Sequence, residues 1–164
     1  MNTSQELAGH LARTLTTELP CLCAIPDGPA TAAPNRPGGV GWSQREELGH
    51  VIDSAVNNHA RIVRATLEAS YEGPSYEQEG WVAAHRYREI PWPELVDVWH
   101  AHNRILLPLI AGIPDAKLAT PCRVGGGPPV TLGFLIDDYV LHMQHHLDML
   151  LRRSPATKYP RAYP

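Results

Sequence analysis

The chain has 164 residues, which is enough for one domain with a substantial core and short for two. Its formal net charge is −3 and its Lys and Arg residues form no basic stripe, which argues against a nucleic-acid partner. The sequence shows neither a signal peptide at its start nor an apolar run long enough to span a membrane, so we expect no membrane association.

The first predicted helix runs from about Thr3 to Leu19. Thr3 and Glu6 form a capping box, in which the hydroxyl and the carboxylate satisfy free backbone N–H groups. Apolar residues then recur every four positions, at Leu7, Leu11, Leu15 and Leu19. We expect Pro20 to end this helix.

The segment from Pro20 to Gly41 is rich in Pro, Gly and Ala and has no hydrophobic period, so it predicts an ordered loop. Cys21 and Cys23 are too close for the usual zinc-ribbon spacing. With Cys122 they make an odd number of cysteines, which fits a reducing compartment, and we expect a cytoplasmic protein.

A second capping box, Ser43 to Glu46, opens a long helix that should extend to about Ser70. The linker 71–92 then has room for a short helical piece around Trp81. Pro93 suits the first position of a third helix that reaches about Gly112. Pro108 lies deep enough in it to bend or shorten it.

The last predicted helix begins near Thr131, after the Pro/Gly-rich loop 114–129, and ends near Arg152 and Arg153. No alternating strand pattern appears anywhere in the sequence. We therefore expect an all-α fold, a four-helix bundle with long Pro/Gly-rich connections. Residues 1–153 should form its single domain and 154–164 a loosely held tail.

His142 and His146 stand four residues apart on the last helix, so their imidazoles project from one face. Both lie on the flank of the apolar arc, whereas His145 points further toward solvent. Two histidines at this spacing form half of a transition-metal site, although such pairs also occur with ordinary hydrogen bonds. A third nitrogen donor is available upstream, at His50.

His50 lies off the apolar stripe of its helix, which leaves two interpretations open. Its face is either solvated or lines a polar cavity at one end of the bundle, where a metal and its water need polar surroundings. The helical wheel mildly favours the solvated face. His59 and His102 have a simpler interpretation as hydrogen-bonded core histidines.

Two segments carry a resemblance to a known family. The stretch from Trp42 to Ser54, with Glu46, Leu48, Gly49 and His50, resembles the second-helix signature of the DinB-like superfamily. The stretch from Thr131 to Leu147 resembles the closing motif of the same superfamily. The similarity extends over roughly 3–151 and implies a four-helix bundle. It also implies that His50, His142 and His146 bind a divalent metal.

The resemblance further implies a metal-dependent enzyme, either a hydrolase or a transferase that uses a low-molecular-weight thiol. Three imidazoles with an open fourth position favour zinc or nickel, with iron or manganese as alternatives. Asp53 and Glu46, each about one turn from His50, are candidates to orient an imidazole or a substrate. A surface role for Asp53 and a capping role for Glu46 are equally open.

Two other interpretations stay open from the sequence. In the first, the chain is a non-catalytic stress-response or binding module whose metal is structural or vestigial. In the second, it is a bundle whose histidines bind nothing. For the enzyme we expect a small-molecule substrate, whose identity the sequence does not show. We also expect a homodimer, since bundles of this size often pair apolar helix surfaces and the resemblance points the same way.

Overall fold

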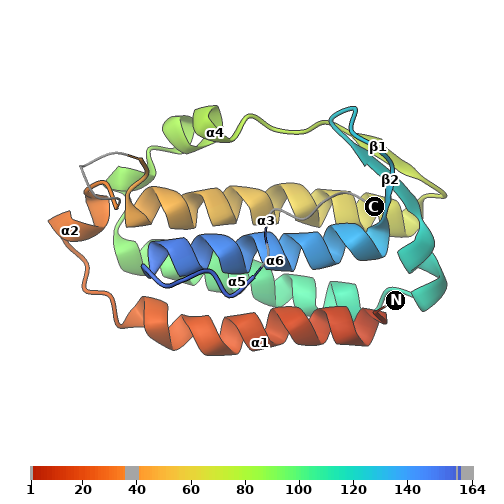
Figure 1. Ribbon diagram of the computed structural model, residues 1–164, viewed down its shortest axis with the longest axis horizontal. Helices are drawn as coiled ribbons and strands as arrows, with labels where there is room; N and C mark the ends of the chain where they lie inside the picture. Colours follow the sequence, from red (N-terminus) through yellow and green to blue (C-terminus); the bar gives the residue numbers. More distant parts are fainter. Residues whose placement is uncertain (1, 36–40, 158, 160–164) are drawn as a thin grey trace.

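Four long helices form the body of the molecule in the computed structural model, which describes residues 2–35, 41–157 and 159 (Figure 1). They are α1 (Ser4–Cys23), α3 (Gln44–Leu67), α5 (Trp92–Ala111) and α6 (Leu132–Leu150). α1 and α3 each pack against both α5 and α6, so α1 and α3 occupy opposite corners of the bundle. The predicted four-helix bundle is confirmed.

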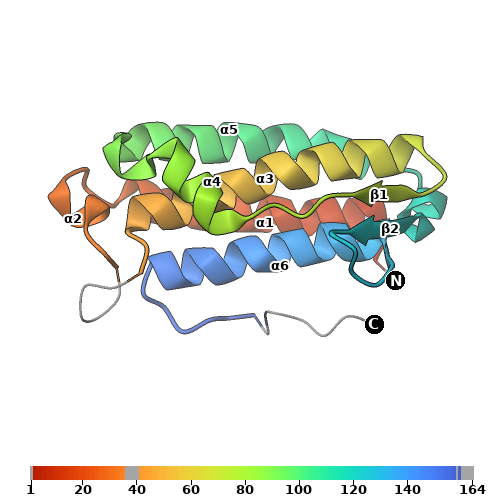
Figure 2. The ribbon, with the colours of Figure 1, turned by 90° about the horizontal axis from the view of Figure 1, so that it is seen from above.

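The chain between α3 and α5 crosses the whole length of the bundle, because these two helices run in the same direction (Figures 1 and 2). This crossover contains β1 (Tyr71–Gly73), α4 (Gln78–His85) and the 3-10 turn η1 (Tyr87–Glu89). α4, the short helical piece expected around Trp81, and η1 both pack against α3. The crossover thus covers a face of α3 that the bundle alone would leave open.

A small three-stranded sheet closes one end of the bundle, so the expectation that no strands form was wrong. β1 pairs in parallel with β2 (Pro121–Val124), and β2 pairs antiparallel with β3 (Val130–Thr131). Strands of two to four residues are too short to show the alternation by which a strand is recognised in a sequence. The short elements α2 (Pro29–Ala32) and η2 (Asp115–Ala119) complete the fold.

Both predicted capping boxes are present. The hydroxyls of Thr3 and Ser43 accept hydrogen bonds from the backbone N–H groups of Glu6 and Glu46, and these carboxylates accept from the backbone N–H groups of the capping residues. Thr131 caps α6 in a similar way, accepting from the N–H of Phe134. The sequence therefore located the starts of these helices to within a residue or two.

Pro20 does not end α1, contrary to expectation, and the helix continues to Cys23. The extra turn is held from outside, because Leu22 is fully buried and its carbonyl accepts a hydrogen bond from Trp92 Nε1 at 2.9 Å. Pro108 likewise lies inside α5, which continues to Ala111. Tertiary packing has compensated for the backbone hydrogen bond that each proline removes.

The chain after α6 is fastened to the bundle over its first residues. Arg153 lies 2.8 Å from carboxylate oxygens of both Glu18 and Asp148, which are buried. The N–H of Ala156 donates to the other oxygen of Asp148. Positions 158 and 160–164 of the expected loose tail lie outside the described residues. No helix among the described residues has the length and apolar character needed to cross a membrane.

Candidate metal centre

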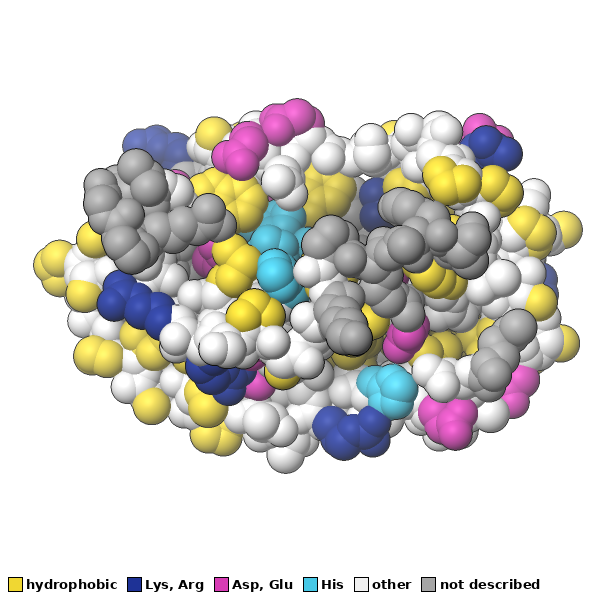
Figure 3. Space-filling view, viewed as in Figure 1, with side chains coloured by type: hydrophobic (Ala, Val, Ile, Leu, Met, Phe, Trp, Pro, Cys, Tyr) yellow, Lys and Arg dark blue, Asp and Glu magenta, His cyan; other side chains and the backbone are white. Residues whose placement is uncertain are grey.

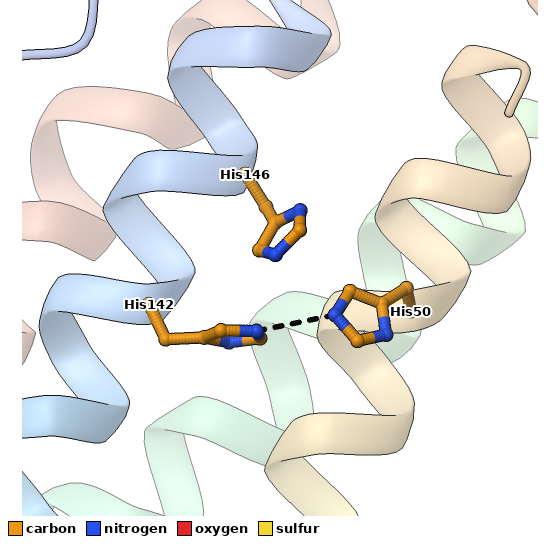
Figure 4. A group of neighbouring side chains, drawn as sticks. All are labelled: His50, His142 and His146. Carbon is orange, nitrogen blue, oxygen red and sulfur yellow. Dashed lines mark hydrogen bonds between the residues drawn. The ribbon is translucent and has the colours of Figure 1, made fainter. Parts of the chain in front are cut away.

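Three histidines from two helices converge between α3 and α6. Nε2 of His50 on α3 lies 3.1 Å from Nε2 of His142 on α6. His146, one turn further along α6, places its ring centroid 4.5 Å from that of His50 and 4.4 Å from that of His142. One nitrogen of each ring lies within 4.8 Å of the other two. Figure 4 shows the three rings facing a common point between the helices.

His50 is buried, with 1% of its surface exposed, so the solvated-face interpretation was wrong. It belongs to a run of nine consecutive buried residues, 47–55, which no single apolar stripe would produce. α5 and α6 cover one side of α3, and α4 and η1 cover another. Trp42 also shields His50 from solvent, since the centroids of the two rings lie 4.9 Å apart.

Glu47 holds His146 in place. Its carboxylate Oε1 lies 2.5 Å from His146 Nδ1, and Glu47 itself is buried. A carboxylate on Nδ1 fixes the ring and leaves Nε2 available, which is the arrangement that commonly supports a metal-binding histidine. Sequence reasoning missed this residue, although Glu47 precedes His50 by three positions and residues three apart share a helix face.

Ser54 plays a similar part for His142. Its Oγ lies 3.3 Å from His142 Nδ1 and also accepts from the side-chain amide of Asn58. His50 lacks such support, since its Nδ1 is buried with no hydrogen-bond partner among the described residues. Two of the three imidazoles are therefore oriented by hydrogen bonds, and the third by the aromatic ring of Trp42 and by packing.

Two of the three histidines, His50 and His142, are held in their neutral form by burial. Burial, followed by the neighbouring His146, lowers the pKa of His50 to about 3. Burial also lowers the pKa of His142 well below its ordinary value, with smaller contributions from His146 and His50. Neutral imidazoles present the lone pairs that a metal requires, so these two rings could bind one at neutral pH without first losing a proton.

Asp53 and Glu46 do not touch the three histidines. Asp53 Oδ1 accepts from the hydroxyl of Tyr87 at 2.6 Å and lies 3.2 Å from Nδ1 of His85. Burial raises the pKa of Asp53, and the bond from Tyr87 opposes that rise. Glu46 caps its helix and lies 2.7 Å from Nε of Arg88. Both carboxylates thus tie α3 to the crossover around η1.

The remaining histidines and cysteines lie away from the centre or at its edge. His59 Nδ1 and His102 Nε2 lie 3.3 Å apart between α3 and α5, and both rings are half-buried. Cys21 and Cys23 are exposed at the end of α1, and Cys122 is buried in β2. His145 does not join the three histidines, but its ring contacts that of His146.

Cavities open on two sides of the centre. The Arg61 cavity, of about 210 Å³, is bordered by His50 and His142 and extends along α3 to Ser54, Asn58 and Arg61.

The Glu79 cavity, of about 230 Å³, lies on the other side of the centre and is bordered by His146, Glu47, Trp42 and Glu79. Gln78 lines both. Figure 3 shows histidine side chains at the surface near the middle of this face.

The donor set fits a divalent transition metal. Two nitrogens bound at 2.0–2.1 Å to a tetrahedral ion lie about 3.4 Å apart, close to the 3.1 Å between the Nε2 atoms of His50 and His142. A metal held by these three side chains would have no fourth protein ligand among the described residues, and a cavity borders two of the three rings. Closed structural zinc sites have four protein ligands, whereas catalytic ones keep a position open.

Comparison with known proteins adds the family. The chain matches the sequence profile of the DinB superfamily over residues 6–150. Its fold is similar to that of YfiT from Bacillus subtilis, described as a probable metal-dependent hydrolase with an unusual four-helix bundle topology. The two share 17% sequence identity with a TM-score of 0.79, over 91% of this chain and 84% of YfiT. No curated protein matches the chain. Because the profile covers most of its length, the chain belongs to the DinB superfamily.

Proposed function

We propose that this protein is a metal-dependent enzyme that acts on a small molecule, with His50, His142 and His146 as the metal ligands. The observation that carries the proposal is the convergence of one nitrogen from each ring within 4.8 Å. The description of YfiT as a probable metal-dependent hydrolase supports it. Zinc or nickel suits three imidazole donors best, and iron(II) or manganese is the alternative.

A divalent metal held here would act as a Lewis acid and lower the pKa of a water or a thiol that it binds. The chain's own residues prepare the site for it. Glu47 fixes the ring of His146, Ser54 fixes that of His142, and burial keeps His50 neutral. The two flanking cavities give room for a substrate beside the open position.

A low-molecular-weight thiol is the nucleophile that the surroundings favour, and water is the second candidate. A thiol has an ordinary pKa near 8.5, so a metal that lowers this pKa is enough to make it a thiolate at neutral pH. Attack by water is faster when a nearby general base accepts its proton. The carboxylates closest to the histidines are already engaged: Glu47 by His146, Glu46 by Arg88 and Asp53 by Tyr87. YfiT's description favours water.

Turnover with and without a chelator tests the proposal. Untagged protein is loaded with zinc or nickel and given monochlorobimane with cysteine, bacillithiol or mycothiol, and separately an ester and an amide panel. We expect consumption of a thiol that stops when the metal is removed and returns when it is restored. A His146→Ala variant should behave like the metal-free protein. Metal binding without turnover in any arm would instead identify a non-catalytic module.

We also propose that the protein forms a homodimer through the outer faces of α3 and α5. Val98 and Ile105 are exposed by 51% and 59%, and they flank His102 at helical spacing on α5. Val56, 43% exposed, lies three residues before His59 on α3. Since His59 contacts His102, these apolar side chains surround one seam between the two helices. A second copy packed there would remove them from water.

A further inference from the structure

Arg61 is a cation on the wall of the cavity that leads to the three histidines. It lies on α3 and is half-buried. Its Nη1 donates to Asn58 Oδ1 at 3.4 Å and its Nη2 to the carbonyl of Pro74 at 3.2 Å. Both acceptors are neutral, and within the described part of the chain Arg61 forms no ion pair. Its charge is therefore held in place without being neutralised.

A continuous line of polar side chains connects Arg61 to the metal centre. Asn58 accepts from Arg61 and donates to Ser54 Oγ at 3.3 Å, and Ser54 contacts His142 Nδ1. His50, Ser54, Asn58 and Arg61 recur at steps of four and three, which places them along one face of α3. This face borders the Arg61 cavity from the histidines to the guanidinium.

The geometry sets the length of molecule that the cavity can accept. His50 and Arg61 are eleven residues apart on one helix, a rise of roughly 16 Å between their Cα atoms. The guanidinium reaches back toward the centre, because its Nη1 lies beside Asn58, one turn closer to His50. The space between the open metal position and the guanidinium therefore suits a small molecule with a short carbon chain, and it is too short for a large ligand.

The other residues that line the Arg61 cavity determine which groups of a ligand it can bind. Tyr76 lines the cavity, and burial raises the pKa of Tyr76 to about 12, so its hydroxyl stays protonated and can donate a hydrogen bond. Leu135 and Val124 supply apolar surface. Asp138 lies on α6 among the lining residues and has a partner of its own. Arg61 is the cationic group that lines this cavity among the described residues.

We propose that Arg61 binds a carboxylate of the substrate, so that the reacting group of a short carboxylic acid is placed at the three-histidine centre. Arginine is suited to this role because its planar fork matches a carboxylate with two parallel hydrogen bonds. The Glu79 cavity, with its two glutamates, disfavours the same anion. This inference rests on the proposed metal-dependent function and adds its substrate class.

Hydroxamates provide the probe, since a hydroxamate binds an open metal position and can carry a second group. Cobalt(II)-loaded protein is titrated with acetohydroxamate, with the monohydroxamates of succinic, glutaric and adipic acid, and with their methyl esters. The visible cobalt spectrum reports binding at the metal. Each acid and its ester differ in charge while sharing a chain length, so their affinity ratio isolates the carboxylate.

We expect one chain length to bind about tenfold or more tightly as the acid than as the ester, the gain typical of a charge-assisted bidentate contact. Arg61→Gln should reduce that ratio to about threefold or less, with acetohydroxamate affinity unchanged. Arg61→Lys should retain part of it. Arg64→Gln, which changes an exposed arginine one turn further along the same helix, should leave it intact.

Equal binding of acid and ester at every chain length would overturn the carboxylate subsite while leaving the metal centre in place. An unchanged preference in Arg61→Gln would overturn it too. Failure of the protein to bind cobalt, or of every hydroxamate to alter the cobalt spectrum, would overturn the proposed open metal position, and the subsite with it. The two failures therefore give different results in one set of titrations.

Discussion

Glu47 Oε1 lies 2.5 Å from Nδ1 of His146, and this contact joins α3 to α6 at the three-histidine centre. Both partners are largely shielded from water, with 5% and 15% of their side-chain surfaces exposed. The hydrogen bond leaves Nε2 of His146 available on the side of the other two rings. Glu47 is therefore a structural link and a positioning residue at once.

Replacing Glu47 by Gln should weaken metal binding by about 10- to 100-fold, because the amide is a poorer acceptor and no longer fixes the tautomer of His146. The dissociation constant is measured by competition with a chromophoric chelator. Glu79→Gln is the matched control, since Glu79 lines the same cavity but bonds to Trp42 Nε1 and not to a histidine. Equal affinities for the two variants would show that Glu47 does not support a metal ligand.

Gly49→Ala should destabilise the protein by about 1–3 kcal/mol, the usual range for overpacking. A Cβ at Gly49 would lie 2.1 Å from Cδ2 of Tyr87, so the ring has to leave α3 and give up its bond to Asp53. Urea denaturation measures the change. Gly9→Ala, whose Cβ would meet only the end of the Arg13 side chain, should be neutral or slightly stabilising. Similar effects at both sites would contradict the close packing of Tyr87.

The three cysteines should differ in reactivity. Burial raises the pKa of Cys122 to about 11, whereas Cys21 and Cys23 are exposed. Only a thiolate reacts rapidly with a disulfide reagent, so we expect two fast thiols and one slow thiol per folded chain at pH 8. Full reaction of the third should require denaturant. Three equally fast thiols in the folded protein would contradict the buried position of Cys122 in β2.

Protonation of His102 should lower stability in acid. Burial, with the neighbouring His59, lowers the pKa of His102 below its unfolded value near 6.5. The unfolded chain therefore binds more protons as the pH falls below about 6.5, and stability falls, by at most about 1.4 kcal/mol per pH unit from this group. His102→Gln should lose less stability between pH 7.5 and pH 5 than the parent.

Chelator is added to these denaturation measurements so that metal binding does not contribute to the measured stability. His100→Gln, which removes a half-buried histidine from the same helix but outside the pair, is the control. Acid sensitivity that is identical in the parent, His102→Gln and His100→Gln would contradict the neutral state assigned to His102.

The proposed dimer makes a prediction about mass. Val98→Glu combined with Ile105→Glu places two charges on the seam between α3 and α5 and should convert the dimer to a monomer in sedimentation equilibrium. Thr16→Glu changes an exposed residue on α1, which lies at the corner of the bundle opposite α3, and should leave the mass unchanged. A monomeric parent protein, or a dimer that survives both glutamates, would refute this interface.

Local signals were enough for much of the fold and for the pairing of His142 with His146, whereas His50 was added to the pair by the resemblance to the DinB-like superfamily. The capping boxes at Thr3 and Ser43 fixed two helix starts, and the four-residue spacing of His142 and His146 placed them on one face. Glu47 lay within reach of the same reasoning, three residues before His50. It was overlooked because a glutamate in the first turn of a helix also has an ordinary role near the helix dipole.

Long-range contacts account for what the sequence did not show. The burial of His50 depends on Trp42 and on a crossover that returns along α3, and no local period encodes that path. Likewise, Leu22 and Trp92 hold the turn of α1 after Pro20, although they are 70 residues apart. The hydrogen bond between Asp53 and Tyr87 could not be predicted from the sequence, because Tyr87 comes from a turn 34 residues further along the chain.

Metal content and ligation together test the central claim most directly. Untagged protein is loaded with zinc, freed of excess metal, and measured by elemental analysis and X-ray absorption. We predict one zinc per chain with three imidazole nitrogens at about 2.0–2.1 Å and a fourth light-atom ligand that acetohydroxamate displaces. His142→Ala should retain its fold and lose the metal. Substoichiometric zinc in the parent, or an unchanged zinc spectrum in His142→Ala, would contradict the metal centre.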